Sequence, residues 1–233
     1  MRTTASRLLA TFRLLALFLV MSAAAVATPP GDARFRLLKL DGYHVKWGTA
    51  EFGAGATVTY AFVNVPRRFD GARNCEELVP VDALARQHRI SLAILHEEAA
   101  AAFRMWERVA NISFRRAENP DEADILIGAQ GRPRGRAYAN VIPRGDKADG
   151  IQGIQQAVAC LNPEHRWKVG FDGNIESFDI RYTLVHEIGH AIGLDHAGPS
   201  GQVMSFSYDE AHYELQPGDI RGAQMLYGIR RMN

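Results

Sequence analysis

The sequence HEIGHAIGLDH, residues 186–196, has the form HExxHxxGxxH. His186 and His190 lie four positions apart, so on a helix their imidazoles project from one face, one turn apart. Two imidazoles placed in this way can bind one Zn²⁺ at about 2.0–2.1 Å each. Gly193 can take the positive φ that lets the chain leave the helix, and His196 then arrives as a third ligand. Three protein ligands leave the fourth position of the metal open, which is typical of a catalytic zinc site.

Glu187 directly follows the first histidine of this stretch. Its carboxylate can reach a water on the metal rather than the metal itself, so we expect it to act as a general base. The alternative is that these histidines are ordinary polar members of a helix and a loop. Only 8 histidines occur in 233 residues, so a chance match of five fixed positions is rare. The pattern therefore favours a metal site.

Composition places the chain among ordinary globular proteins. It is 47% hydrophobic and 23% charged, which excludes disordered, collagen-like and coiled-coil chains. The 27 Lys and Arg against 26 Asp and Glu give a net charge of +1, so no basic surface favours nucleic acid as a partner. A length of 233 residues suits one large domain that folds without a dense disulfide framework.

Residues 1–27 have the pattern of a secretory signal peptide. Their charges are three arginines, and an apolar run without acids ends in Ala25-Val26-Ala27, a small-x-small cleavage site. The run is too short to cross about 30 Å of hydrocarbon, so we expect cleavage rather than a stable membrane anchor. Removing three arginines from the 27 basic residues leaves 24 against 26 acids, a net charge of −2. The mature protein is then secreted or periplasmic.

Hydrophobic periodicity predicts three helices in the mature chain. Apolar residues recur every three or four positions from Ser91 to Val109, which is typical of an amphipathic helix packed on a sheet. A second helix is predicted from an N-cap at Ser177 to Ile192, and a last helix over Pro217 to Tyr227. Strands are predicted at 57–63, 112–115, 123–129, 136–142 and 156–161. This order of elements indicates a single mixed α/β domain, more narrowly α+β, preceded by a short leader over 28–45.

Cys75 and Cys160 are the two cysteines of the chain, and neither stands in a CxxC context typical of metal binding. In an exported protein an even pair favours a disulfide over two free thiols. A bridge between them closes a loop of about 85 residues and could contribute about 4 kcal/mol in the chain-entropy model.

On these residues the sequence resembles the metzincin zinc peptidases, and among them the matrixins. The stretch 186–196 fits metzincins in general. Met204, in the sequence VMS eight residues past the third histidine, resembles their Met-turn, whose methionine packs beneath the zinc. Tyr208 matches a position that helps to wall the S1′ pocket of matrixins, and 215–228, LQPGDIRGAQMLYG, is similar to their C-terminal helix. The resemblance covers about 57–228.

The resemblance implies a metzincin-like zincin catalytic domain over 46–233. Such a domain has a twisted, mixed and mostly parallel sheet with an antiparallel edge strand, a long active-site helix, a Met-turn and a C-terminal helix. It also implies one catalytic Zn²⁺ on His186, His190 and His196, with Glu187 as the general base.

Several departures from the animal matrixins define a bacterial-type, pared-down member. No PRCGxPD-like cysteine switch precedes the domain, and 28–56 is too short for a folded pro-domain. Tyr138 stands where matrixins usually carry a histidine, and Cys160 lies where another zinc-binding histidine falls. We therefore expect one zinc ion per chain, without a second, structural one. Calcium sites have no clear counterpart, so calcium is left as an unsupported cofactor.

The resemblance also places the substrate. The strand that carries Arg136, Ala137, Tyr138 and Ala139 lies at the sheet edge in metzincins, where an extended peptide can pair with its free main-chain groups. Phe206 and Tyr208 suggest an apolar S1′ wall and a hydrophobic P1′ residue. They could instead be core packing.

The arginines at positions 132, 134 and 136 alternate along one loop. They form either a solvated rim or a subsite for acidic side chains, and the sequence leaves this open. The resulting hypothesis is a secreted, monomeric zinc endopeptidase that acts on a peptide or protein substrate. The alternative is a catalytically inactive, zinc-stabilised secreted binding protein of the same fold.

Overall fold

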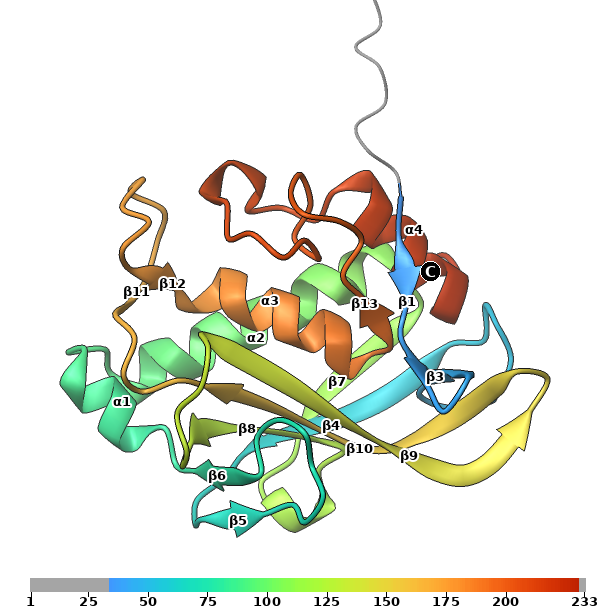
Figure 1. Cartoon of the computed structure of the whole chain (residues 1–233), viewed down its shortest axis with the longest axis horizontal. Helices are drawn as coiled ribbons and strands as arrows, with labels where there is room; N and C mark the ends of the chain where they lie inside the picture. Colours follow the sequence, from blue (N-terminus) through green and yellow to red (C-terminus); the bar gives the residue numbers. More distant parts are fainter. Residues whose placement is uncertain (1–33, 231–233) are drawn as a thin grey trace, which may run out of the picture.

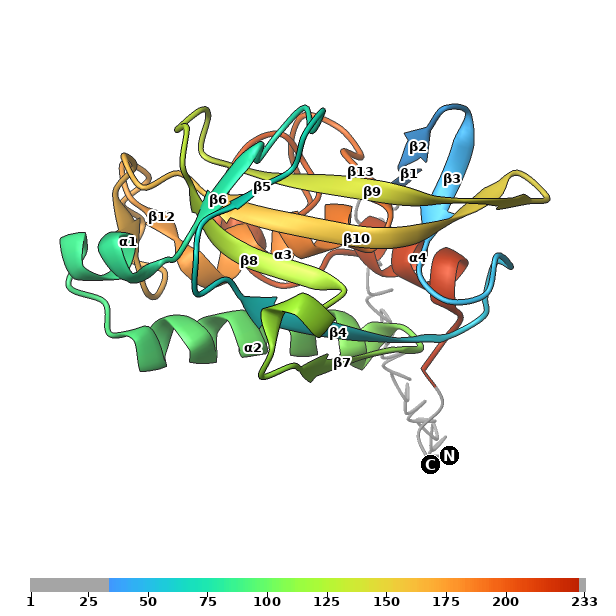
Figure 2. The same cartoon turned by 90° about the horizontal axis from the view of Figure 1, so that it is seen from below.

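A mixed β-sheet carries two long helices on one face and a short hairpin on the other (Figures 1 and 2). The computed structural model describes residues 34–230, so the predicted signal peptide over 1–27 lies outside the described residues. The helices are α1 (Asp82–Gln87), α2 (Leu92–Val109), α3 (Ile180–Ala191) and α4 (Pro217–Tyr227). Short 3-10 turns are η1 (Pro120–Glu122) and η2 (Glu210–His212). The strands are β1 (Arg36–Leu37), β2 (Lys39–Leu40), β3 (Tyr43–Lys46), β4 (Ala56–Phe62), β5 (Arg67–Arg68), β6 (Glu77–Val79), β7 (Ile112–Arg116), β8 (Ile125–Gln130), β9 (Ala137–Ala148), β10 (Ile151–Leu161), β11 (Trp167–Lys168), β12 (Phe178–Asp179) and β13 (Leu194–Asp195).

The main sheet runs in the order β2-β3-β10-β8-β4-β7, and β9 pairs with the outer side of β10. The pairs β3–β10, β10–β8, β8–β4 and β4–β7 are parallel, whereas β9 is antiparallel to β10. Among the described strands β9 has β10 as its one neighbour, so its outer edge is free. This confirms the predicted mixed, mostly parallel sheet with an antiparallel edge strand.

Helix α2 forms as its hydrophobic period predicts. The Ser91 side chain caps it by accepting a hydrogen bond from the Ile94 N–H at 3.2 Å. The stripe that includes Leu95, Ala99 and Trp106 is completely buried against the sheet and α3. The Trp106 indole N–H donates to the Val185 carbonyl at 3.0 Å, which fixes α2 against α3. Figure 2 shows the two helices on the same side of the sheet.

Helix α3 begins later than the sequence predicts. The expected N-cap at Ser177 is wrong, because Phe178 is held in an extended conformation by pairing with Trp167 of β11. Asp179 caps the helix instead, and its carboxylate accepts from the Tyr182 N–H at 2.7 Å. The predicted end is confirmed at Gly193, whose φ is +104°. An added Cβ there would lie 2.1 Å from the Val45 carbonyl oxygen, so only glycine fits.

The region expected to be a leader contributes strands to the fold. β1 pairs with β13, and β3 pairs with β10, so the boundary expected at residue 46 falls inside β3. Arg36 of β1 forms an ion pair with Asp195 at 2.9 Å, next to the third histidine. Strands of two to four residues are too short to show a hydrophobic period, which is why the sequence did not reveal them.

Strands β9 and β10 form a hairpin that is longer than predicted. They extend to Ala148 and from Ile151, and turn through Asp149 and Gly150, which both have positive φ. The outer half of β9 is exposed and polar, so it lacks the apolar alternation that marks a strand. The remaining predicted strands and the C-terminal helix are confirmed within two residues at each end.

Candidate metal centre

Three histidines converge at the C-terminal end of α3. His186 and His190 lie one turn apart on this helix, and His196 follows β13. His186 Nε2 and His190 Nε2 lie 3.2 Å and 3.3 Å from His196 Nε2. Within residues 34–230 this is the one group of three or more His, Cys, Asp or Glu side chains whose ligand atoms come within 4.8 Å of one another. The predicted ligand set is therefore assembled.

The hydrogen bonds of two of these imidazoles leave their Nε2 atoms free for a metal. His186 Nδ1 donates to the Val203 carbonyl at 2.7 Å, and His190 Nδ1 donates to the Leu194 carbonyl at 2.8 Å. Burial lowers the pKa of all three histidines, that of His196 to about 4. Neutral rings so oriented point lone pairs at one another, an arrangement that a cation stabilises.

The spacing fits zinc. Two ligands bound about 2.05 Å from a tetrahedral zinc ion lie about 3.3 Å apart, which the Nε2–Nε2 distances match. Nitrogen donors and an open fourth position suit zinc better than calcium, which prefers six to eight oxygen ligands.

Met204 lies directly beneath the ligand helix. Its side chain is 2% exposed and packs against Gly189, between the two helical histidines. A Cβ on Gly189 would lie 2.2 Å from Met204 Sδ, so the glycine permits the close approach. The position of Met204 agrees with the Met-turn that the resemblance implies.

Asp219 fixes this turn, and the sequence reasoning gave it no role. It is 1% exposed at the start of α4. Its carboxylate accepts from the N–H groups of Val203 at 3.1 Å, Met204 at 3.0 Å and Gln216 at 2.8 Å. Because the Val203 carbonyl accepts from His186, Asp219 orients a ligand through one intervening residue. The signal that could have indicated a capping role is its position in the first turn of the predicted helix over 217–227.

Glu187 is 4% exposed beside the histidines. Burial raises its pKa to about 8, against the opposing effects of the Arg136 charge and a hydrogen bond from the Ala139 N–H. The carboxyl group therefore faces β9 across the cleft. A carboxyl group that can hold and release a proton near neutral pH is suited to general acid–base chemistry.

A cleft of about 520 Å³ opens over the histidines and runs along β9. The expected substrate-binding residues Arg136, Ala137, Tyr138 and Ala139 line it, together with Glu187 and all three histidines. Since no second strand pairs with β9 among the described residues, an extended chain lying in the cleft would meet main-chain groups that another strand does not occupy.

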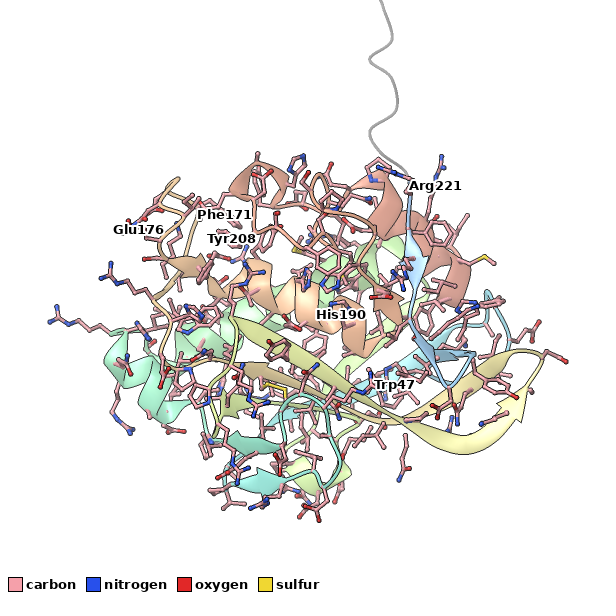
Figure 3. All side chains as sticks on the ribbon, in the orientation of Figure 1. Trp47, Phe171, Glu176, His190, Tyr208 and Arg221 are labelled. Carbon is pink, nitrogen blue, oxygen red and sulfur yellow. A yellow bond between two sulfur atoms is a disulfide. The ribbon has the colours of Figure 1, made fainter. Side chains whose placement is uncertain are left out.

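Tyr208 is not among the residues that line this cleft. Its ring packs edge-on against Tyr182 and Phe178, and its hydroxyl donates to Glu210 at 2.7 Å. Phe206 lines the cleft instead, where it is 65% exposed and stacks on the His196 ring at 4.0 Å. Figure 3 shows Tyr208 near the N-terminal end of α3 and His190 near its C-terminal end.

The predicted disulfide between Cys75 and Cys160 is confirmed. It joins the β5–β6 loop to the C-terminal end of β10, so the Cys160 sulfur is bonded in the bridge and is not available to a metal. The same loop brings Arg73 and Asn74 to the rim of the cleft, where Asn74 Nδ2 donates to the Ala139 carbonyl at 3.5 Å. Sequence reasoning missed both residues, because they become part of the site only through the distant cysteine pairing.

The partly buried ammonium group of Lys168 links two loops near Tyr208. Lys168 Nζ contacts Asp172, donates to the Asn174 carbonyl at 2.9 Å and pairs with Glu210 Oε1 at 2.6 Å. Glu210 in turn accepts from the Tyr208 hydroxyl. The lysine was not identified from the sequence, since its partners lie up to 42 residues away.

Histidines from an HExxHxxGxxH helix, an adjacent glutamate and a methionine beneath them define a zinc site of the metzincin class. The matrixin family model matches residues 83–228. The chain is 31% identical over 137 residues to human (Homo sapiens) matrix metalloproteinase-20, covering 56% of this chain and 27% of that protein. It is 33% identical over 137 residues to matrilysin of Felis catus, covering 56% and 50%, and 27% identical over 146 residues to interstitial collagenase B of Mus musculus, covering 60% and 30%.

The chain belongs to the matrixin family. It spans half or less of the length of these relatives. The part that the family model matches contains the histidine site. Among residues 34–230, none of the helices combines the length and the apolar character needed to cross a membrane.

Proposed function

We propose that this protein is a secreted or periplasmic, monomeric zinc endopeptidase that hydrolyses peptide bonds in peptide or protein substrates. The observation that carries the proposal is the complete set of His186, His190, His196 and Glu187 around one cleft. Membership of the matrixin family and the disulfide support an exported peptidase.

The metal and the protein side chains have separate roles in the reaction. When bound by the three histidines, zinc would supply Lewis-acid chemistry, which makes the attacking water more acidic and polarises the scissile carbonyl. Glu187 takes the proton from the attacking water and then delivers it to the leaving amine. Its burial keeps this proton within the cleft rather than in bulk solvent. The Val203 and Leu194 carbonyls hold the imidazoles in the tautomer that ligation needs.

Substrate binding uses the free edge of β9. An extended peptide in the cleft adds to this strand through main-chain hydrogen bonds, which hold it without regard to its side chains. Selectivity then depends on the side chains at the cleft walls, among them Arg136 and Phe206.

The alternative is an inactive, zinc-stabilised binding protein of the same fold. Degenerate enzymes usually lose a ligand or the general base, whereas here all four residues are in place. The intact set favours the enzyme.

A chelator-sensitive assay on a mixed peptide library separates the two. We expect cleavage by the zinc-loaded protein, loss of cleavage with chelator and recovery on adding zinc. His190→Ala should abolish cleavage, whereas His212→Ala, on η2 and outside the cleft, should not. A folded, zinc-loaded protein that cleaves no library member would support the binding protein instead.

A further inference from the structure

Arg136 stands immediately before β9 with its side chain at the wall of the cleft. Its guanidinium carbon lies 5.0 Å from the ring centre of Phe178 and 5.3 Å from that of Tyr208. Its Nε atom is buried and has no hydrogen-bond partner. Within residues 34–230 no carboxylate comes within ion-pair distance of this guanidinium. The rings hold the cation in place, but they give the Nε–H no hydrogen-bond acceptor.

The other two arginines of the same loop have different surroundings. Arg132 pairs with Glu76 at 3.4 Å and with Glu77 at 3.6 Å, away from the metal centre. Arg134 is exposed and lies outside the cleft lining. Of the three alternating arginines, Arg132 and Arg134 therefore belong to the solvated rim, and Arg136 faces the site.

The charge of Arg136 acts on the reaction centre itself. Arg136 lines the same cleft as Glu187 and the three histidines, so its charge faces the residues that carry the proposed reaction. A partly buried guanidinium without a carboxylate binds one strongly, because its planar fork matches two carboxylate oxygens and the unpaired Nε–H gains an acceptor.

The strand direction indicates which substrate residue meets Arg136. Ala139 and Glu187 line the same cleft, and the Ala139 N–H is the main-chain group that acts on the Glu187 carboxyl group, so we place the scissile bond opposite Ala139. Arg136 lies three residues nearer the start of the strand, about 10 Å away. A peptide added antiparallel to β9 therefore places the residue after the scissile bond (P1′) toward Arg136. An arginine and a glutamate side chain together span this distance.

We propose that Arg136 is a specificity-determining residue that selects a substrate carboxylate at P1′, supplied by a glutamate or aspartate side chain. The inference rests on the proposed function, because it names the substrate class of that site. It differs from the sequence-based expectation of a hydrophobic P1′ residue, which rested on Phe206 and Tyr208. Phe206 lines the cleft, whereas the Tyr208 ring lies against the guanidinium and outside the cleft lining.

The test measures binding and requires no turnover. Short peptides with an N-terminal hydroxamate bind the metal through that group, which fixes the register, and place their first residue at P1′. Calorimetry with the zinc-loaded protein compares Glu with the isosteric Gln at this position, each with an amidated C-terminus. A third ligand, Gln with a free C-terminal carboxylate, distinguishes a side-chain carboxylate from a chain end.

We expect the Glu ligand to bind about tenfold or more tightly than the Gln amide. Arg136→Gln should reduce this ratio to below threefold, and Arg136→Glu should reverse it, so that the Gln amide binds more tightly than the Glu ligand. The matched control Arg134→Gln should leave the ratio unchanged, with zinc content verified for every variant. Equal binding of Glu and Gln by the unmodified protein, or a ratio that survives Arg136→Gln, would overturn the proposal. If the zinc-loaded protein cleaves no peptide but still binds the Glu ligand more tightly than the Gln ligand, and does so only with Arg136 present, the proposed function is refuted and the role of Arg136 in binding is retained.

Discussion

Asp219 gives the sharpest stability test of how the metal centre is held. Replacing it with Asn keeps the size of the side chain but leaves one acceptor oxygen in place of two. The oxygen at the Oδ2 position can still accept from Val203 and Gln216, while the new NH₂ group faces the Met204 N–H. The Asn NH₂ group and the Met204 N–H are then two hydrogen-bond donors that face each other, at a residue that is only 1% exposed.

The expected loss of stability follows from these bonds. A hydrogen bond to a charged acceptor contributes about 1.5–3 kcal/mol, and the two that remain become weaker, neutral bonds. Burial raises the pKa of Asp219, so the native carboxylate carries a desolvation penalty that Asn relieves in part. The net loss is about 3 kcal/mol in the free energy of unfolding. For a domain of about 200 residues this lowers Tm by about 6–12 °C.

Thermal unfolding with and without zinc measures this effect. We also expect weaker zinc binding by Asp219→Asn, since the Val203 carbonyl that orients His186 belongs to the same turn. Asp70→Asn, at an exposed position, should stay within about 0.5 kcal/mol of the unmodified protein. A variant at Asp219 that melts within 2 °C of the parent (roughly the smallest shift expected per kcal/mol) and keeps its zinc affinity would refute the reasoning.

Three further predictions concern the cysteines, Lys168 and the metal. Intact-mass analysis without reductant should find no alkylatable thiol, and two free thiols in the native protein would contradict the disulfide. Replacing Cys75 and Cys160 with Ser should lower the free energy of unfolding by about 4 kcal/mol. The same replacement should raise KM more than it changes kcat. Lys168→Met should speed hydrogen exchange over 169–176, because three partners of its ammonium group lose their contact; unchanged exchange there would refute the role. Elemental analysis should find one tightly held zinc ion per chain, and two would overturn the single site.

Much of the metal centre could be predicted because its determinants are local. His186, Glu187 and His190 share one helix, and Gly193 returns His196 within a few residues, so spacing alone fixes their arrangement. Helix α2 could be predicted equally well, since its buried apolar residues recur along all 18 residues of the helix. In both cases the sequence period and the tertiary contacts favour the same structure.

The parts that could not be predicted depend on distant contacts. Phe178 is extended because it pairs with Trp167, and this contact moved the N-cap of α3 away from Ser177. Tyr208 lies outside the cleft lining because Glu210 binds its hydroxyl, and Glu210 is held by Lys168. No short window of sequence contains such pairs, so local pattern cannot assign the walls of the cleft.

The zinc content and peptide turnover of Glu187→Gln, measured side by side, test the central claim most directly. Gln cannot take a proton from water, yet it keeps the size of the side chain and leaves the three histidines unchanged. Glu97→Gln, exposed on α2, serves as the matched control. The account predicts one zinc ion in each protein and a loss of about 10²–10⁴-fold in kcat for Glu187→Gln alone. A zinc-loaded Glu187→Gln protein that cleaves peptides as fast as the parent would contradict it.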